Sequence, residues 1–367
     1  MVPINAPQID KREIEMVVRV LKSGFLTARV GSSSTVANFE QAYAKFAEAK
    51  HAVAVNSGTA ALHMSLLAAG VKQGDEVIVP SFTFVASAEA VVLSGAKPVF
   101  ADINPQTYNI DPERFRKAIS AKTRAVIPVD LYGLSADMQA ISEIAEEHNL
   151  AVIEDAAQAH GAAYRGKSPG YFADMACWSF YASKNMTTGE GGMITTNNDG
   201  YSDTLRCMRS HGEKGEYVSF MLGHNYRMPE IEAAIGIAQL EKLPTFSEKR
   251  RGNAQRLTEK LNLVKRLTLP REPEGYKHSW YLYTVRLQDN NRTGRDKAVE
   301  ELRKRGIGAT IYYSTPIHLM PYYSQFATHN LPETEKASEQ VYSLPVHPGV
   351  TLQEINCIVD SVIEVVG

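Results

Sequence analysis

Residues 51–70, HAVAVNSGTAALHMSLLAAG, combine an apolar run, a short polar turn and a helical pattern. The apolar run predicts a buried strand, and Leu62, Leu66 and Leu67 give the following segment the apolar stripe of a helix packed on a core. Gly70 suits the end of that helix, because glycine readily adopts the left-handed conformation found there. The stretch therefore indicates a strand–turn–helix unit.

The same alternation continues to about Asn198. Further strands are predicted in the runs DEVIVPS, KPVFAD, RAVIPVD, LAVIED, MACWSFY and MITTN, and helices in FVASAEAVVLSG and MQAISEIAEEHN. Nearly continuous apolar strands that alternate with helices are typical of a mostly parallel sheet covered on both faces, the α/β class. In such sheets ligands bind beyond the carboxyl ends of the strands, so those ends are the places to search for a site.

The pattern changes after Tyr226. MPEIEAAIGIAQLEKL predicts a helix that ends at Pro244, and FSEKRRGNAQRLTEKLNLVKRL predicts a second helix. A strand (WYLYTVRL), a helix (RDKAVEELRKRG) and a strand (ATIYY) are expected next. We therefore predict a large domain over residues 1–243 and a smaller α+β domain over 244–367. Residues 203–225 show no clear period and are predicted to form a long, functional loop.

The composition excludes several classes of protein. The 367 residues contain 39 Lys and Arg against 41 Asp and Glu, a net charge of −2, which argues against a general nucleic-acid binder. The three cysteines lie far apart and form neither a zinc pattern nor a disulfide framework. The first residues lack the apolar core of a signal peptide, and no apolar run reaches the length of a membrane span. We expect a soluble, cytoplasmic protein that binds no metal, nucleic acid or membrane.

Two strand ends carry residues that could bind a flat, phosphorylated ligand. Ser57, Gly58 and Thr59 lie where a strand turns into a helix, and the free N–H groups of a helix start suit a phosphate. Phe82 and Phe84 follow the strand DEVIVP, and an aromatic side chain there could stack on a ring. Taken singly, an ordinary helix cap and ordinary core packing explain these residues better.

A third strand ends in two acids, Glu154 and Asp155, followed by the small residues Ala156 and Ala157. A buried carboxylate is costly unless a cation or hydrogen-bond donors meet it, and a protonated ring nitrogen is one such partner. A helix-capping role is equally compatible with these acids. The residues themselves do not distinguish Glu154 from Asp155.

The fourth strand end opens the stretch SFYASKNMTTGEGG, residues 179–192, with Ser179 ending the strand and Lys184 in the following loop. A neutral, desolvated lysine is a nucleophile, whereas a solvated loop lysine has no chemical role. The combination of residues at the four strand ends favours a chemical role for Lys184 over a solvated loop lysine. A phosphate cradle, an aromatic platform, a strand-end acid and a lysine together describe a site for pyridoxal 5'-phosphate.

These stretches also resemble a known family. NSGTAAL, PSFTFVAS, EDAAQAHGA, SFYASKNMTTGEGGM, GHNYRMPEIEAAIGIAQL and IYYSTPIHLMPYY, in this order, are similar to the DegT/StrS-like sugar aminotransferases, which are fold-type I pyridoxal phosphate enzymes. The resemblance implies an aspartate-aminotransferase-like fold. It also implies that Lys184 forms the internal Schiff base, that Asp155 pairs with the pyridinium nitrogen and that Gln158 contacts the phenolic oxygen. Phe84 and Ala157 would lie on the two faces of the ring.

The resemblance assigns further roles. The backbone of Gly58 and Thr59 and the hydroxyl of Ser179 would hold the phosphate, and Asn225 would reach the phosphate of a neighbouring subunit in a homodimer with shared sites. Tyr313 and His318 would lie near the sugar.

The residue at position 184 also separates two branches of this family. A related branch that removes a sugar hydroxyl carries histidine at this position, so this lysine implies an aminotransferase. The implied reaction moves the amino group of L-glutamate to a nucleotide-linked keto sugar.

Two departures from the family pattern concern the substrate region. TARVGSSSTVANFE is a few residues longer than the usual loop, and Ser314 stands where proline is more usual. Two alternatives remain at this point. A regulatory protein on the same fold could use a basic stretch to meet an acidic partner, formed by His211, Lys214, His224 and Arg227. An aminotransferase for small amino acids would need an arginine that the sequence does not reveal.

Overall fold

A computed structural model describes residues 1–27, 34–215, 217–288 and 291–367. Among these residues, seven strands form one large sheet in the order β1-β8-β7-β5-β4-β2-β3. Only β8 runs antiparallel to its neighbours, so the predicted mostly parallel sheet of the α/β class is confirmed. The strands are β1 (His51–Val55), β2 (Glu76–Pro80), β3 (Lys97–Ala101), β4 (Thr123–Val126), β5 (Ala151–Asp155), β7 (Met175–Ser179) and β8 (Gly192–Thr196).

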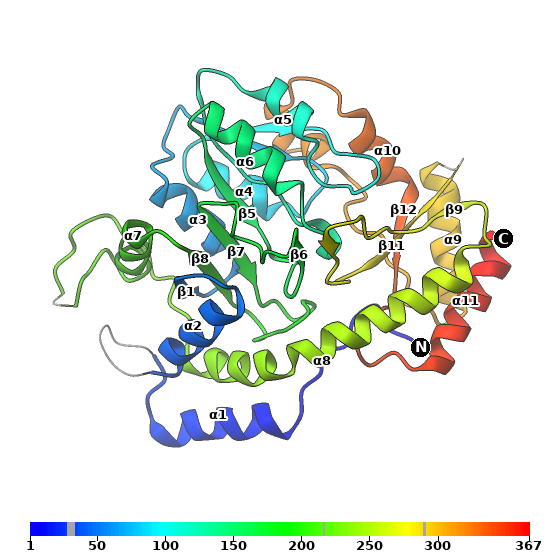
Figure 1. Ribbon diagram of the computed structural model, residues 1–367, viewed down its shortest axis with the longest axis horizontal. Helices are drawn as coiled ribbons and strands as arrows, with labels where there is room; N and C mark the ends of the chain where they lie inside the picture. Colours follow the sequence, from blue (N-terminus) through cyan, green and yellow to red (C-terminus); the bar gives the residue numbers. More distant parts are fainter. Residues whose placement is uncertain (28–33, 216, 289–290) are drawn as a thin grey trace.

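Helices cover both faces of this sheet, as the apolar strands predict (Figure 1). Alternation along β2 illustrates the two faces: Val77 and Val79 pack in the cluster that contains α3 and α4, whereas Ile78 packs with α5 and α6. A third cluster, on the face of Trp178, packs against α2. The helices are α2 (Thr35–Phe46), α3 (Gly58–Ala68), α4 (Ala86–Leu93), α5 (Pro112–Ala118), α6 (Met138–Glu147) and α7 (Asp199–Arg209).

The C-terminal part of the chain has its own small antiparallel sheet, in the order β12-β11-β9. Its core includes Tyr283 and Val285, and Val2 joins this core from the other end of the chain. Its elements are β9 (Leu267–Thr268), β11 (Tyr283–Leu287), α9 (Arg292–Lys304), α10 (Pro332–Gln340), β12 (Val341–Leu344) and α11 (Leu352–Val366). The short pair β6 (Ala163–Tyr164) and β10 (Tyr276–Lys277) links the two parts. The described residues also form three 3-10 turns, η1 (Leu131–Gly133), η2 (Ile317–Leu319) and η3 (Tyr323–Phe326).

The strand predicted for ATIYY is wrong. Within it, only Thr310 makes an isolated bridge, to Ser343. Strand β11 pairs with β12, which the sequence analysis did not recognise, and Thr310 lies beside β12. A short apolar run with no clear alternation does not by itself show whether the segment forms a regular strand of the sheet.

The helix predicted to end at Pro244 does not end there. Helix α8 (Glu230–Leu261) is continuous over 32 residues, with Pro244 inside it. A proline inside a helix costs about 3 kcal/mol or more. Here Leu243 and Phe246 are buried on either side of it, so packing outweighs this cost. The proposed domain boundary at 243/244 falls within α8, which runs beneath the large sheet toward α11 (Figure 1), and the division into two domains stays a prediction.

The predicted loop over 203–225 is partly helical, because α7 extends to Arg209. The remainder turns back on itself through bridges between Ser210 and Asn225 and between Glu213 and Ser219. Of the longer loop noted in TARVGSSSTVANFE, residues 28–33 lie outside the described residues.

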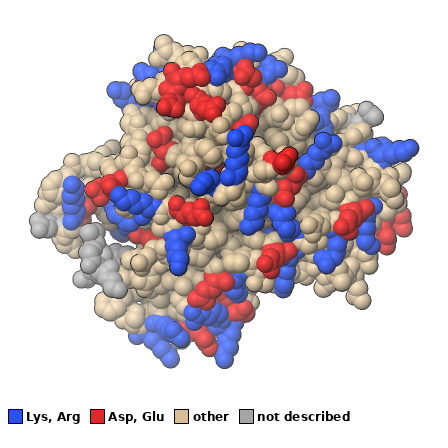
Figure 2. Space-filling view, viewed as in Figure 1, with Lys and Arg blue, Asp and Glu red and all other residues tan. Residues whose placement is uncertain are grey.

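Acidic and basic side chains are interspersed on the face drawn in Figure 2, in keeping with the nearly balanced charge of the chain. Within the described ranges, no helix combines the length and apolarity needed to cross a membrane.

Candidate active site

A cavity of about 450 Å³ opens beyond the carboxyl ends of β1, β2, β5 and β7. Its position agrees with the rule for ligands in open α/β sheets. Both parts of the chain contribute to it. The strand ends and following loops provide Ser57, Gly58, Thr59, Leu62, Thr83, Phe84, Ala86, Asp155, Ala157, Gln158, Ser179, Tyr181, Ser183, Lys184 and Glu190, and the C-terminal part provides Tyr281, Tyr312 and Tyr313.

The start of α3 forms one end of the cavity. Ser57 caps the helix by accepting a hydrogen bond from the N–H of Ala60 (3.0 Å). Gly58 lies so close to β7 that a Cβ atom there would sit 2.9 Å from the Cβ of Ser179. The backbone N–H groups of the first helical turn therefore remain reachable beside the Ser179 hydroxyl, an arrangement that fits a phosphate.

Asp155 faces the cavity from the end of β5. Its carboxylate accepts hydrogen bonds from the Ser87 hydroxyl (2.8 Å) and the N–H of Ala157 (3.2 Å). Burial raises the pKa of Asp155, and the Ser87 hydroxyl, the Ala157 N–H and the Lys184 ammonium oppose that rise. A buried carboxylate held in this way on a cavity wall fits a protonated ring nitrogen.

Glu154 points to the other side of the sheet. Its carboxyl accepts from the N–H of Gly170 (2.6 Å) and lies beside the carboxyl of Asp130. Burial raises the pKa of Glu154 to about 7, and burial together with Glu154 raises the pKa of Asp130 well above its usual range. The choice between the two acids, open at the level of the residues, thus follows from strand alternation: Asp155 reaches the cavity.

Lys184 lies in the loop between β7 and β8. Its Nζ is 4.8 Å from the ring centroid of Tyr281, and the Tyr281 hydroxyl lies 2.9 Å from the hydroxyl of Ser183. Tyr281 was missed by the sequence analysis, because it follows Lys184 by almost a hundred residues and no local signal links them.

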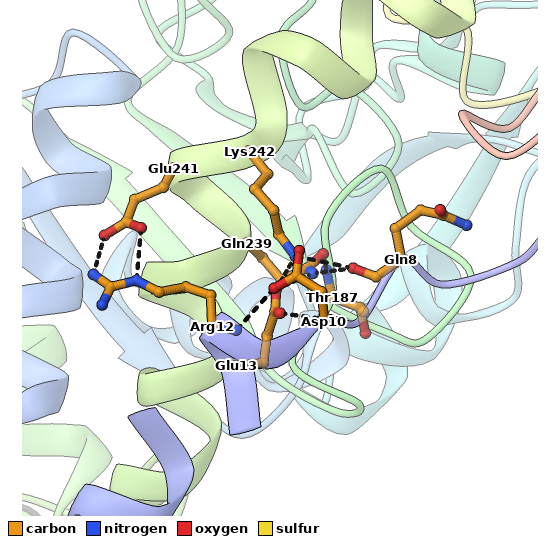
Figure 3. A network of polar contacts seen from close by, with 8 residues as sticks. All are labelled: Gln8, Asp10, Arg12, Glu13, Thr187, Gln239, Glu241 and Lys242. Atoms are coloured by element: carbon orange, nitrogen blue, oxygen red, sulfur yellow. Dashed lines mark hydrogen bonds and ion pairs between the residues drawn. The ribbon is translucent and has the colours of Figure 1, made fainter. Parts of the chain in front are cut away.

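The loop after Lys184 is tied by polar contacts to α8 and through it to α1 (Lys11–Ser23), as Figure 3 shows. The N–H of Thr187 donates to Gln239 (3.4 Å), and the amide of Gln239 donates to Glu13 (2.6 Å). Lys242 pairs with the same buried Glu13 carboxylate (2.5 Å). These contacts join the loop to two helices and limit its movement.

The ring platform consists of Phe84 and Ala157, which both line the cavity. Phe84 is 60% exposed, so its ring face is open to a ligand. Gln158 is fixed beside them, because its Oε1 accepts from the N–H of Tyr132 (2.8 Å) and its Nε2 donates to the Tyr313 hydroxyl (3.0 Å). The cradle at Gly58, the buried Asp155 and this platform together fit pyridoxal phosphate.

Two predicted site residues are not among those that line the cavity. Asn225 is exposed on the segment after α7, and its predicted contact with a neighbouring subunit stays a prediction. His318 is buried behind the cavity, against Ser81 and Glu335, and its predicted place beside the sugar also stays a prediction. Ser314, the departure from the family pattern, is exposed, and its carbonyl accepts from Arg292 (2.9 Å).

Residues 7–363 match the model of the DegT/DnrJ/EryC1/StrS aminotransferase family. The chain belongs to this family. The resemblance carried by the six sequence stretches is confirmed, and the protein is an enzyme of the aminotransferase class.

Individual relatives agree over nearly the full length of the chain. GDP-perosamine synthase from Caulobacter vibrioides is 40% identical over 361 residues, which cover 98% of this chain and 96% of the relative. A pleiotropic regulatory protein from Geobacillus stearothermophilus is 38% identical over 371 residues, 98% of each chain. Among solved structures, the PLP form of Spr1654, a putative sugar aminotransferase from Streptococcus pneumoniae, has a TM-score of 0.94 at 28% identity and covers 99% of this chain and 98% of that chain.

Proposed function

We propose that this protein is a pyridoxal phosphate-dependent sugar aminotransferase that moves the amino group of L-glutamate to a nucleotide-linked keto sugar. The observation that carries the proposal is the meeting of Asp155, Lys184 and the glycine cradle at Gly58 in one cavity. These are the three elements that the ring nitrogen, the aldehyde and the phosphate of the cofactor require.

Each element has a defined task. Gly58, Thr59 and Ser179 would hold the phosphate, and Asp155 would keep the ring nitrogen protonated. The bound cofactor supplies an electron sink for the carbon that loses a proton. Lys184 is the amine that would bond to the cofactor aldehyde and, once released by the amino donor, would take a proton from the donor α-carbon and return one.

The remaining cavity wall favours a hydroxylated substrate. Tyr181, Tyr281, Tyr312 and Tyr313 place hydroxyl groups around the space beside Lys184. A hydroxyl both donates and accepts hydrogen bonds, which suits the hydroxyl groups of a sugar.

The charge of the cavity supports a homodimer with shared sites. Among the described residues that line it, Lys184 is the only lysine or arginine, although a nucleotide diphosphate and the cofactor phosphate are both anionic. The exposed segment with Lys214 and Asn225 could supply polar and positive groups from a second copy. Mixing two inactive variants, Lys184→Ala and Asn225→Ala, should then restore part of the activity if Asn225 acts across the interface.

The regulatory relative supports a second candidate, a sensor that uses the same cavity without turnover. Retention of both Lys184 and Asp155 favours the enzyme, because a sensor has no need of an amine nucleophile.

The first test is spectroscopic. The protein loaded with pyridoxal phosphate should show a visible absorption band that fades when L-glutamate is added, with release of one 2-oxoglutarate per site. Lys184→Ala should bind cofactor without this donor-dependent change and without turnover. A band that ignores L-glutamate would overturn the donor, and normal turnover by Lys184→Ala would overturn the role of the lysine. Panels of keto sugars and keto acids then separate a sugar acceptor from an amino-acid aminotransferase.

A further inference from the structure

His318 makes an unusual set of contacts behind the cavity. It is 2% exposed and lies between the carboxyl end of β2 and helix α10. Its Nδ1 is 2.7 Å from the hydroxyl oxygen of Ser81, and its backbone N–H donates to the same oxygen (2.9 Å). The N–H of Ile317 donates to the Ser81 carbonyl (3.0 Å). Three hydrogen bonds with two consecutive residues therefore hold Ser81.

The protons of this cluster can be assigned from its geometry. Because Ser81 Oγ already accepts from the backbone N–H, its own hydrogen is free to point at Nδ1 of His318. The imidazole proton then lies on Nε2, which is 3.3 Å from a carboxylate oxygen of Glu335. Burial lowers the pKa of His318, against the opposing effects of Glu335 and Asp102, so the neutral ring required by this assignment is favoured.

This serine–histidine–glutamate chain is not a hydrolytic triad. Ser81 is 0% exposed, so no substrate can reach its hydroxyl. A nucleophile must contact the atom that it attacks. The role of these three residues is therefore structural. It follows from the two segments of the protein to which Ser81 and His318 belong.

Ser81 begins the connection from β2 to α4 that carries Thr83 and Phe84, one wall of the cavity. His318 follows Tyr312 and Tyr313, which form another wall. The two segments also touch directly, because the rings of Phe82 and Tyr313 lie 5.8 Å apart in an edge-to-face contact. A fixed Ser81–His318 contact thus fixes one wall relative to the other.

We propose that Ser81 and His318 form a clamp that sets the position of the Phe84 wall relative to the tyrosine wall, and that His318 is a positioning residue without contact to the substrate. The proposal rests on the proposed function, in which Phe84 stacks on the cofactor ring.

Two substitutions of His318 distinguish the roles of its two ring nitrogens. The asparagine amide occupies the place of Nδ1, and the glutamine amide occupies the place of Nε2. His318→Asn therefore retains a partner for Ser81, whereas His318→Gln retains a partner only for Glu335. Ser81→Ala removes the other half of the clamp, and Glu335→Gln serves as a control for the outer contact.

The measurement is a titration of each variant with pyridoxal phosphate, followed by the circular dichroism of the bound cofactor. Ser81→Ala and His318→Gln should each weaken cofactor binding by about five- to tenfold, the effect of one lost buried hydrogen bond, and change the dichroic signal. The double variant should bind the cofactor no more weakly than Ser81→Ala alone, because Ser81→Ala already removes the side-chain contact that His318→Gln breaks, together with the hydrogen bond from the His318 backbone N–H. His318→Asn and Glu335→Gln should bind like the wild type.

A direct contact with the sugar gives a different result. His318→Asn would then raise the KM for the sugar while the cofactor titration stayed unchanged, and Ser81→Ala would have no effect. That result overturns the clamp. If the wild-type protein binds no pyridoxal phosphate, the proposed function fails, and thermal unfolding of the same variants still tests the clamp. Additive losses of stability from Ser81→Ala and His318→Gln would overturn it, whereas non-additive losses would support it.

Discussion

The two sides of the cavity are built in different ways. On the floor, formed by the strand ends, short-range contacts help to fix the functional groups: Ser57 caps its own helix, and Asp155 accepts from the N–H two residues on, in addition to its bond from the more distant Ser87. On the tyrosine wall the contacts span long distances in sequence, 98 residues from Ser183 to Tyr281 and 155 from Gln158 to Tyr313. The strand ends therefore position the chemical groups of the floor with the help of short-range contacts. The tyrosine wall gives the cavity its shape through tertiary packing.

The largest expected effect comes from breaking the floor at Asp155. Asp155→Asn keeps the shape and removes the charge that would hold a proton on the ring nitrogen. Turnover should fall on the order of a hundredfold or more, the usual loss when a preorganised electrostatic group is removed. Steady-state rates with saturating L-glutamate and keto sugar measure this.

The neighbouring acid is the matched control, because Glu154 lies on the same strand and is also buried. Glu154→Gln should leave turnover within about threefold of the wild type, since its contacts are to Gly170 and Asp130 on the far side of the sheet. Equal losses of turnover in the two variants would show that the effect does not depend on whether the acid faces the cavity.

The floor is also the part that the sequence predicts well. Lys184, Gly58 and Ser179 stand at strand ends that apolar runs reveal, so their meeting in one cavity follows from the parallel sheet. The wall has no such signal. Tyr281 and Tyr312 reach the site only after the C-terminal part packs on the sheet, and this packing depends on helix α8 continuing through Pro244, against the local preference of proline.

His318 shows the same limit of sequence analysis. Its motif places it near the cavity in the chain, but only the folded structure shows that Ser81 and Glu335 take up both of its nitrogens.

A second floor variant tests the phosphate cradle. Gly58→Ala would bring a Cβ to 2.9 Å from the Cβ of Ser179 and 3.4 Å from its Oγ, so α3 or β7 must shift. Cofactor binding should weaken by roughly tenfold or more, because a misplaced helix start loses its aligned N–H groups. Equilibrium titration with pyridoxal phosphate gives the affinity.

Gly252→Ala provides the control for the added methyl group. It lies within α8, where the new Cβ meets only the flexible end of Arg256 (3.1 Å). This variant should bind cofactor normally and gain about 0.5–1 kcal/mol of stability from the better helix former. Normal affinity in Gly58→Ala would argue that the phosphate binds elsewhere.

Glu154, on the far side of the sheet from the cavity, should make the stability of the protein depend on pH. Burial raises the pKa of Glu154 from 4.5 in the unfolded chain to about 7 in the folded protein, so the folded state holds this proton more tightly. The contribution of Glu154 to the free energy of unfolding therefore falls as the pH rises from about 4.5 to 7. Glu154→Gln cannot ionise, and it also removes the effect of Glu154 on the pKa of Asp130, which burial keeps raised. The stability of the variant relative to the wild type should therefore rise over this window, on the order of 1–3 kcal/mol.

Urea unfolding at several pH values between 5 and 8 measures that difference. Glu232, whose pKa burial and Glu190 also raise to about 7, contributes equally to both proteins and cancels. Parallel curves for Glu154→Gln would mean that its carboxyl ionises as readily inside the protein as in water.

The smallest effect is expected on the wall. Tyr313→Phe removes a buried hydroxyl from the amide of Gln158 but keeps the ring stacked on Tyr132 (6.1 Å between centroids). Gln158 stays anchored by the Tyr132 N–H, so the KM for the sugar should rise by no more than about fivefold, the worth of one hydrogen bond, with kcat nearly unchanged.

The matched control is Tyr283→Phe, which also removes a buried hydroxyl from one side-chain partner, Thr258 (2.8 Å), but in the core of the C-terminal part. Both variants should lose a similar amount of stability, about 1 kcal/mol. Only Tyr313→Phe should change the KM, since only its hydroxyl lies on the wall of the cavity. If both variants change it equally, the wall responds to the stability of the whole C-terminal part, and the contrast between a chemical floor and a shaping wall no longer holds.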